Sequence, residues 1–129
     1  MTVQYNITPR KDPRNQESDP KYYATVRSNG RVDTRGIAKS INNMSTVSSV
    51  DTAAVLEAFL SVVPDQLADG RIVELGDFGS FRLSVSSEGT EKPESFTTRH
   101  ITDVRVIFTP GKRFKGVLNT AEFQKVSEN

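Results

Sequence analysis

The sequence contains no cysteine and a single histidine, His100. The absence of cysteine excludes disulfide frameworks, thiolate zinc sites and a cysteine nucleophile. It is consistent with a reducing compartment, so we expect a cytoplasmic protein. No second His or Cys completes a metal site around His100, which is expected to be a surface or packing residue. We therefore expect no cofactor and no metal.

Long apolar runs are also absent. Nowhere do eighteen apolar residues follow one another, and the N-terminal residues MTVQYNITPRKDPR contain no apolar segment of the kind found in signal peptides. The sequence therefore predicts neither secretion nor a membrane partner.

Motifs typical of enzymes are missing too. The spacing GxxxxGK[ST] of a phosphate-cradling loop does not occur. Asp77-Phe78-Gly79 spells the metal-binding triplet of protein kinases, but the chain has neither an HRD loop nor a VAIK lysine. No Ser/His/acid arrangement suggests itself around His100. We expect a protein that is not an enzyme and has no small-molecule substrate.

The overall charge is nearly neutral, with 17 Lys and Arg against 16 Asp and Glu. Its distribution is uneven. Residues 1–32 carry six basic and three acidic groups, and residues 96–116 carry five basic and one acidic. Residues 33–70 hold two basic and five acidic groups, and residues 88–95 hold one and three. Positive charge therefore gathers near the start and near the end of the chain.

Alternating apolar residues predict two strands near the N-terminus, over residues 3–7 and 22–26. The loop between them, Thr8 to Pro20, is polar and rich in proline. These strands could extend a sheet, cover its edge or exchange between subunits, and Arg10, Lys11 and Arg14 could add phosphate contacts from the loop. The sequence leaves these alternatives open.

Two helices are predicted next. A short one follows Asp33 or Thr34 as its N-cap. A longer one starts at Ser48, which forms an imperfect capping box with Asp51, and extends to Leu67. The longer helix is apolar around most of its circumference, so it either lies inside a monomer core or packs against a second copy of itself. Pro64 should kink or locally unwind it, since proline removes one backbone donor.

Gly70 ends the helical region, and two antiparallel strands are predicted around a Gly-Asp-Phe-Gly turn, from Ile72 to Val85. A polar segment precedes a further strand between Phe96 and Phe108. Pro110-Gly111 ends that strand, and the basic residues Lys112, Arg113 and Lys115 begin a short amphipathic helix. Gly111 and these three cations look like a phosphate grip, although short basic runs are also common on solvated helix ends.

The order of these elements and the runs Glu74–Phe81 and Phe108–Lys115 resemble the HU/IHF family of bacterial DNA-bending proteins over residues 33–119. With the N-terminal extension, the chain is similar to an extended HU-like branch typical of Bacteroides-type bacteria. The resemblance implies an α+β, IHF-like (HU-like) fold. Such a fold has two N-terminal helices, an antiparallel three-stranded sheet with a β-arm, and a short C-terminal helix, here with an N-terminal β extension. It also implies an intertwined homodimer whose arms embrace the minor groove and insert a proline between base pairs.

Carried over by position, the resemblance assigns phosphate contacts to Lys112, Arg113 and Lys115. Positions at the base of the arm are structural: Gly76, Phe78, Gly79, Phe81, Pro110 and Gly111. The arm itself offers Arg82, Lys92, Pro93, Arg99 and Arg105, and strand alternation would place Arg99 on the same face as Ile101 and Arg105. The four phenylalanines Phe78, Phe81, Phe108 and Phe114 are expected to be core residues.

The arm departs from the family's pattern. Where that arm is rich in arginine and lysine and its tip is Arg-Asn-Pro, this chain has Ser87-Glu88-Gly89-Thr90-Glu91-Lys92-Pro93-Glu94-Ser95. Pro93 is the candidate wedge, but it lies between Lys92 and Glu94 and is better explained as an ordinary loop proline. Glutamates near phosphates oppose the electrostatic attraction that drives non-specific binding.

From these features we predict three segments: a strand-rich extension over 1–32, an HU-like DNA-binding domain over 33–119 and a tail over 120–129. The expected function is a sequence-tolerant, histone-like protein of the bacterial nucleoid. It would bind double-stranded DNA through the phosphate backbone and the minor groove. The alternative is an HU-fold structural or protein-interaction module with weak or lost DNA binding.

Overall fold

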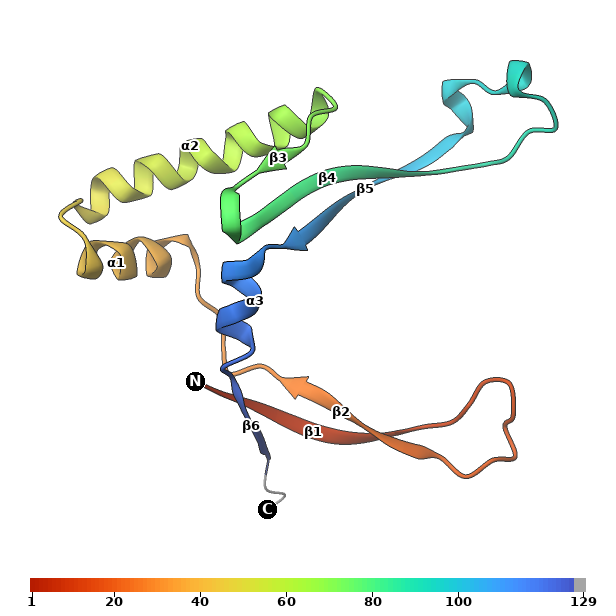
Figure 1. Cartoon of the computed structure of the whole chain (residues 1–129), viewed down its shortest axis with the longest axis horizontal. Coiled ribbons are helices and arrows are strands. Elements are labelled where there is room, and N and C mark those ends of the chain that lie inside the picture. The colour runs from red at the N-terminus through yellow and green to blue at the C-terminus, as the bar shows by residue number, and fades with distance from the viewer. Residues whose placement is uncertain (127–129) are drawn as a thin grey trace. The chain divides into compact units, whose positions relative to one another are not determined.

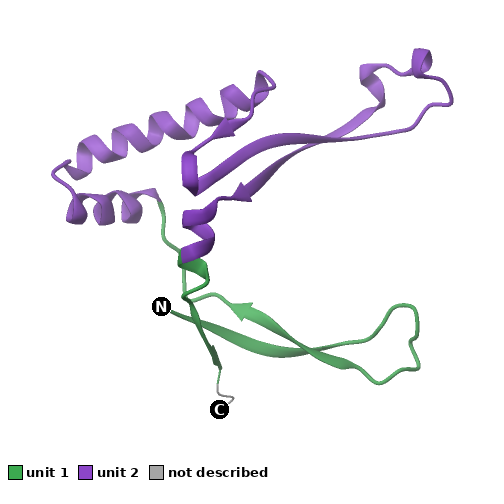
Figure 2. Cartoon of the chain, in the orientation of Figure 1, with its two compact units in different colours: residues 1–33, 117–129 green, residues 34–116 purple. Residues whose placement is uncertain are grey.

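The computed structural model describes residues 1–126, and its helices and mostly antiparallel strands form a mixed α+β fold (Figure 1). The chain divides into two compact units (Figure 2). Unit 1 contains residues 1–33 and the C-terminal segment from Val117, and unit 2 contains Thr34–Gly116. Each unit has its own three-stranded sheet.

Unit 1 is built on the sheet β2-β1-β6. Strands β1 (Thr2–Arg10) and β2 (Lys21–Arg27) form an antiparallel hairpin, which confirms the two strands predicted there. The third strand, β6 (Glu122–Lys125), lies parallel to β1 and was not predicted. Its four residues are too few to show a period, and only the pairing with β1 makes them a strand.

The two predicted helices of unit 2 are present as α1 (Thr34–Met44) and α2 (Ser49–Ala68). The Ser48 hydroxyl accepts a hydrogen bond from the backbone N–H of Asp51 at 3.1 Å, so Ser48 is the N-cap of α2 as predicted. No helix within residues 1–126 is long and apolar enough to cross a membrane.

Helix α2 continues through Pro64, so the predicted local unwinding does not occur. Proline costs the helix one backbone hydrogen bond. Leu67, in the next turn, is buried, and its burial helps to stabilise this end of the helix.

The sheet of unit 2 has the order β3-β4-β5, with β3 (Val73–Glu74), β4 (Gly79–Ser87) and β5 (Ile101–Pro110) all antiparallel. A 3₁₀ turn, η1 (Gly76–Phe78), joins β3 to β4 and confirms the predicted turn. Strand β5 begins at Ile101 rather than Phe96, because Pro93–Ser95 (η2) and Thr98–His100 (η3) form 3₁₀ turns. Helix α3 (Lys112–Leu118) follows β5.

Few apolar side chains of the single chain are buried. Among the described residues only Ala38 and Leu67 qualify, and the predicted core residue Phe78 is 46% exposed. The α2 stripe is open as well, with Val55 66%, Phe59 41% and Val62 51% exposed. Helix α2 therefore does not lie inside a monomer core, which was one of the two alternatives for its broad apolar surface.

Candidate nucleic-acid interface

The turn η1 and the start of α3 interlock through backbone atoms. The N–H of Gly111 donates to the carbonyl oxygen of Phe78 at 2.9 Å, and the N–H of Lys115 donates to the carbonyl of Gly111 at 3.0 Å. A Cβ on Gly111 would overlap the carbonyl group of Asp77. Glycine is therefore required here by the close approach of two backbone segments. The first turn of α3 is thus held directly against η1.

Gly79, at the start of β4, meets a second close approach. Its φ is +143°, and a Cβ there would lie 2.5 Å from the carbonyl oxygen of Thr109 and 2.7 Å from the ring of Phe108. Gly79 and Pro110 are also register partners across β4 and β5. The residues predicted to be structural at the base of the arm do come together.

An aromatic cluster surrounds this junction. The ring of Phe108 lies 4.8 Å from that of Phe81, 5.6 Å from Phe78 and 5.4 Å from Phe114, measured between centroids. Phe78 and Phe114 meet edge to face at 5.2 Å. Such pairs stabilise by about 0.5–1.5 kcal/mol beyond the burial of their area. The cluster joins η1, β4, β5 and α3 within unit 2.

The three cations of the predicted phosphate grip follow directly after this junction. Lys112, Arg113 and Lys115 are all exposed, and they occupy the first turn of α3 itself rather than a loop before it. Because Gly111 and Phe114 fix this turn, the backbone that carries the cations is held in place. Exposed cations on a fixed turn can bind a phosphate without first ordering the chain.

Strands β4 and β5 form a ribbon with two different faces. The register pairs Phe81 with Phe108, Leu83 with Val106 and Val85 with Val104 on one face. It pairs Arg82 with Ile107, Ser84 with Arg105 and Ser86 with Asp103 on the other. The predicted site residues Arg82 and Arg105 are therefore diagonal neighbours on the polar face, which also carries the acid Asp103.

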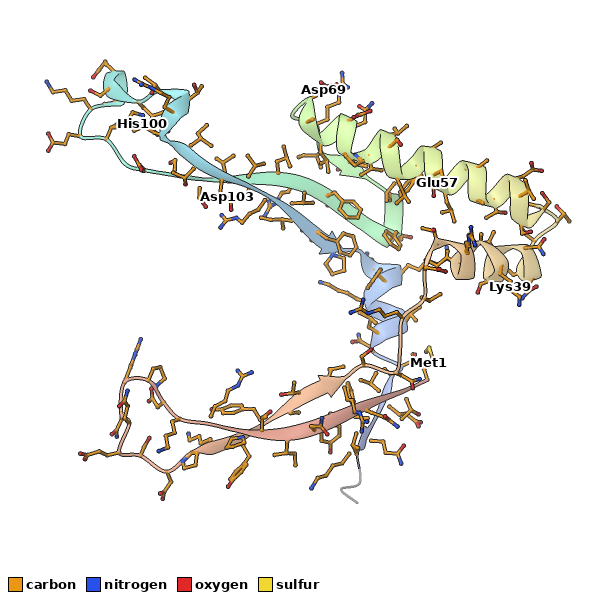
Figure 3. The ribbon with its side chains drawn as sticks, turned by 180° about the vertical axis from the view of Figure 1, so that it is seen from behind. Met1, Lys39, Glu57, Asp69, His100 and Asp103 are labelled. Atoms are coloured by element: carbon orange, nitrogen blue, oxygen red, sulfur yellow. The ribbon has the colours of Figure 1, made fainter. Side chains whose placement is uncertain are left out.

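Lys92, Pro93 and Arg99 lie elsewhere, in the loop at the far end of the ribbon. Pro93 occupies the first position of η2, and Arg99 lies within η3. Because η3 is a 3₁₀ turn, strand alternation does not extend back to Arg99, and its predicted common face with Ile101 and Arg105 is wrong. His100 is in the same loop (Figure 3), where its ring stacks on Phe96 at 5.2 Å and its Nδ1 accepts a hydrogen bond from the backbone N–H of Thr97.

The far end of the ribbon is about 27 Å from its base, since β4 advances about 3.4 Å per residue over its nine residues. The site residues thus form three groups: the α3 cations, the Arg82–Arg105 pair and the end loop. The ribbon as a whole, residues 79–110, is electrically neutral, with four basic and four acidic groups. Three of those acids, Glu88, Glu91 and Glu94, lie at its far end.

No group of three or more His, Cys, Asp and Glu residues that could hold a metal ion occurs within residues 1–126. What the described arrangement offers is exposed cations on one fixed helical turn and one strand face. Such groups can bind anions and position a polyanion.

Comparison with known proteins places the chain in a family. Residues 1–125 match the HU-HIG family, described as "HU domain fused to wHTH, Ig, or Glycine-rich motif". The DNA-binding protein HU of Buchnera aphidicola subsp. Baizongia pistaciae (strain Bp) is 29% identical over 82 residues, which cover 62% of this chain and 89% of that protein.

Among solved structures, a candidate bacterial DNA-binding protein from Bacteroides vulgatus ATCC 8482 matches with a TM-score of 0.67 and 14% identity. That match covers 99% of this chain but 49% of the Bacteroides protein, so the chain spans about half of its length. At this identity the likeness concerns the fold alone. The family match extends over nearly the whole chain, including the N-terminal hairpin, and the chain therefore belongs to the HU-HIG family of HU-domain proteins.

Proposed function

We propose that this chain is a sequence-tolerant, histone-like DNA-binding protein of the bacterial nucleoid that acts as a homodimer in the cytoplasm. Residues 33–119 would be the DNA-binding domain, with 1–32 as an extension and 120–129 as a tail. The observation that carries the proposal is the set of exposed cations Lys112, Arg113 and Lys115 on a turn fixed by Gly111. The HU relative, itself a DNA-binding protein, supports it.

In this proposal the α3 cations bind backbone phosphates, and the polar face of the β4–β5 ribbon lies along the duplex. Arg82 and Arg105 would add phosphate or minor-groove contacts from that face. Lys92, Pro93 and Arg99 would approach the DNA from the end loop. Because the ribbon carries no net positive charge, we expect the α3 cations to supply most of this unit's electrostatic attraction.

The dimer is proposed from the surface that the single chain leaves exposed. Its accessible area is 11285 Å². A compact monomer of this length exposes about 6,800 Å², and two separate compact units of these sizes expose about 8,100 Å². The excess is about 3,000 Å² per chain, or about 6,000 Å² for two chains, which is as large as the total area that extensive obligate dimers bury.

Apolar side chains form part of this exposed surface. A groove of about 400 Å³ is lined by Val63, Pro64, Leu67 and Ala68 of α2 and by Phe81, Leu83, Val104 and Val106 of the ribbon. A second copy of the chain would cover this groove and the adjacent α2 stripe. A Val55→Asp variant should therefore dissociate the dimer in sedimentation experiments, whereas Ser61→Asp, which adds the same charge on the Glu57 side of α2, should not. A parent chain that sediments as a monomer would contradict the dimer, and a Val55→Asp variant that stays dimeric would contradict this interface.

The function is tested by titrating the full chain into a random-sequence duplex of about 30 base pairs at several salt concentrations. We expect log affinity to fall linearly with log salt, with a slope near −0.9 per phosphate contact. A Lys112→Glu/Arg113→Glu/Lys115→Glu variant should lose binding and keep the circular dichroism spectrum and mass of the parent. Undiminished affinity of that variant would remove the α3 cations from the site.

A second candidate function is an HU-fold structural or protein-interaction module without DNA binding. The neutral ribbon and its acidic end loop with Glu88, Glu91 and Glu94 favour it. The same titration separates the two, because this alternative predicts no binding to the duplex even at low salt.

A further inference from the structure

The β1–β2 hairpin has a polar face whose only charged side chains are basic. The register places Arg10 opposite Lys21, Thr8 opposite Tyr23, Asn6 opposite Thr25 and Gln4 opposite Arg27. Residues opposite one another in an antiparallel pair share a face. Neither β1 nor β2 contains an acidic residue. Three cations therefore share one face of the hairpin with hydroxyl, amide and phenol groups.

Contacts across the strands confirm that these side chains are neighbours. The hydroxyls of Thr8 and Thr25 are 2.6 Å apart, and the guanidinium carbon of Arg10 lies 5.8 Å from the ring centroid of Tyr23. The second contact is a cation–π interaction, which holds the Arg10 side chain against the face. Arg10, Lys21 and Arg27 are all exposed to solvent.

The apolar residues of this sheet lie on its opposite face. Val3, Tyr5 and Ile7 alternate with the polar positions of β1, and Ala24, Val26 and Phe123 are on their side. Lys125, the register partner of Tyr5 in β6, is on that side as well, whereas Glu122, the register partner of Thr2, lies at the end of the polar face. The cationic face therefore has no apolar rim of the kind that binding to a membrane surface requires.

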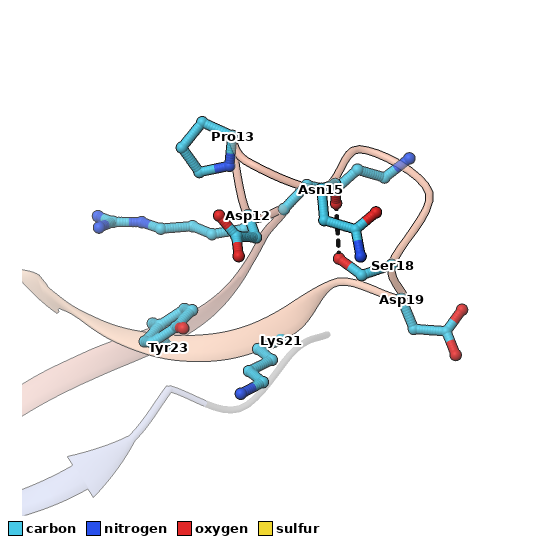
Figure 4. Close-up of a pocket in the computed structure, with 9 residues that line it drawn as sticks. Asp12, Pro13, Asn15, Ser18, Asp19, Lys21 and Tyr23 are labelled. Carbon is cyan, nitrogen blue, oxygen red and sulfur yellow. Dashed lines mark hydrogen bonds between the residues drawn. The ribbon is translucent and has the colours of Figure 1, made fainter.

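The acids of the hairpin are confined to the loop at its tip. Asp12, Glu17 and Asp19 all lie between the strands, where the carboxylate of Asp12 accepts a hydrogen bond from the backbone N–H of Arg14 at 2.9 Å. The Ser18 hydroxyl donates to the carbonyl of Asn15 at 2.7 Å within the same loop, beside Lys21 and Tyr23 (Figure 4). Residues 2–27 hold five basic and three acidic groups, whereas the β4–β5 ribbon holds four of each. The N-terminal hairpin is the more basic of the two ribbons.

The length of the face suits a nucleic-acid backbone. Lys21 and Arg27 are six residues apart, about 20 Å along an extended strand. One strand of a duplex advances about 3.4 Å per nucleotide, so this distance corresponds to about six nucleotides. Between the cations, Thr and Tyr hydroxyls and the Asn6 and Gln4 amides can donate hydrogen bonds to phosphate oxygens.

We propose that this face, formed by Arg10, Lys21, Arg27 and the polar side chains between them, is a second DNA-contact surface that binds the phosphate backbone. The proposal rests on the proposed DNA-binding function and adds a surface outside the β4–β5 ribbon and α3. Sequence reasoning considered Arg10 only as part of a loop. The signal that it missed is that Arg10, Lys21 and Arg27 fall at alternate positions of two strands that lack any acid.

The first test uses the unmodified chain and acetylation of lysine side chains with and without duplex DNA. Lys21 and Lys125 lie on opposite faces of the same sheet and are both exposed. We expect saturating duplex to slow acetylation of Lys21 at least tenfold and to leave Lys125 unchanged. Protection of Lys112 and Lys115 without protection of Lys21 would overturn the second surface and leave the proposed function intact. Protection of none of them would remove the proposed function itself.

The second test measures the salt slope of an Arg10→Gln/Lys21→Gln/Arg27→Gln variant. Its control is Arg31→Gln/Lys39→Gln/Lys125→Gln, which removes the same charge away from the face. For each hairpin that contacts the duplex, the slope of log affinity against log salt should become about 2.7 less steep in the hairpin variant. Its affinity at 0.15 M salt should fall by about 100-fold. Equal slopes for the two variants would contradict the proposal. If the hairpin variant lost binding to anionic vesicles or to an acidic polypeptide but kept its affinity for DNA, the proposal would be overturned. The face would then bind another polyanion.

Discussion

Replacement of Gly111 by alanine should destabilise the protein more than its single added methyl group suggests. The new Cβ would overlap the carbonyl group of Asp77 and lie 3.1 Å from the backbone nitrogen of Gly79. All of these are backbone atoms of a tight turn, so no side chain can rotate away to relieve the overlap.

The magnitude follows from two terms. Overpacking a close contact costs about 1–3 kcal/mol. If the two segments move apart to relieve the overlap, the hydrogen bond from the Gly111 N–H to the carbonyl of Phe78, 2.9 Å long in the parent, is broken. Its loss costs a further 0.5–1.5 kcal/mol, roughly. We expect Gly111→Ala to lower the free energy of unfolding by about 2–4 kcal/mol in urea denaturation. Parent and variant must be compared at equal protein concentration, because the stability of the proposed dimer would depend on it.

Gly116 provides the matched control, because it lies five residues further on, within α3. Nothing lies within 4 Å of the position that its Cβ would take. Alanine should therefore stabilise the helix there by about 0.5–1 kcal/mol through its higher propensity. The two substitutions have opposite expected signs. If Gly111→Ala stayed within about 0.5 kcal/mol of the parent, the docking of α3 against η1 would be refuted.

Two further substitutions test the junction and the cap. Phe108→Ala removes the ring that contacts Phe78, Phe81 and Phe114, so it should cost about 3 kcal/mol and reduce the near-ultraviolet circular dichroism signal. An unfolding midpoint equal to that of the parent would contradict the cluster. Ser48→Ala removes the acceptor for the Asp51 N–H and should cost about 1 kcal/mol, whereas Ser61→Ala within α2 should cost nothing. Equal effects of the two serine variants would argue against the cap.

Local chemistry made much of unit 2 predictable. Ser48 as an N-cap, the turn between Glu74 and Gly79 and the helix after Gly111 all depend on residues within a few positions of one another. Capping and turn formation are local interactions, so the sequence carries their signal directly. The base of the candidate site was predictable for the same reason.

Features that depend on distant partners were harder to predict. Strand β6 exists because it pairs with β1, more than 100 residues earlier in the chain. The placement of Arg99 depends on a capping box in which Thr97 and His100 exchange hydrogen bonds and close a 3₁₀ turn. The alternation of apolar residues through Ile101 resembles that of a strand, so the sequence pattern does not reveal the turn. A two-residue side-chain period does not show where a strand begins.

Burial was the least predictable property. Phe78, Val55 and Phe59 have the residue types of a core, yet the single chain leaves them 41–66% exposed. Hydrophobicity indicates that a side chain will be covered, but the sequence does not say whether its own chain or another one covers it. The folded single chain shows only that these three side chains are not covered by their own chain.

Both sheets of this protein have one apolar and one polar face, so the proposed dimer contact and the proposed DNA contact of the β4–β5 ribbon would use opposite faces. In the β4–β5 ribbon the apolar face carries Leu83, Val104 and Val106, and the arginines lie opposite. A two-stranded ribbon is marginally stable in water unless its apolar face is covered. Covering that face by a second chain would leave Arg82 and Arg105 free for a duplex.

Val55→Asp, which should separate the chains, should then weaken DNA binding even though Val55 carries no charge and lies in α2. Raising the protein concentration should restore binding by the variant, because mass action favours the dimer. Monomeric Val55→Asp with the parent's DNA affinity would show that the ribbon does not need its partner.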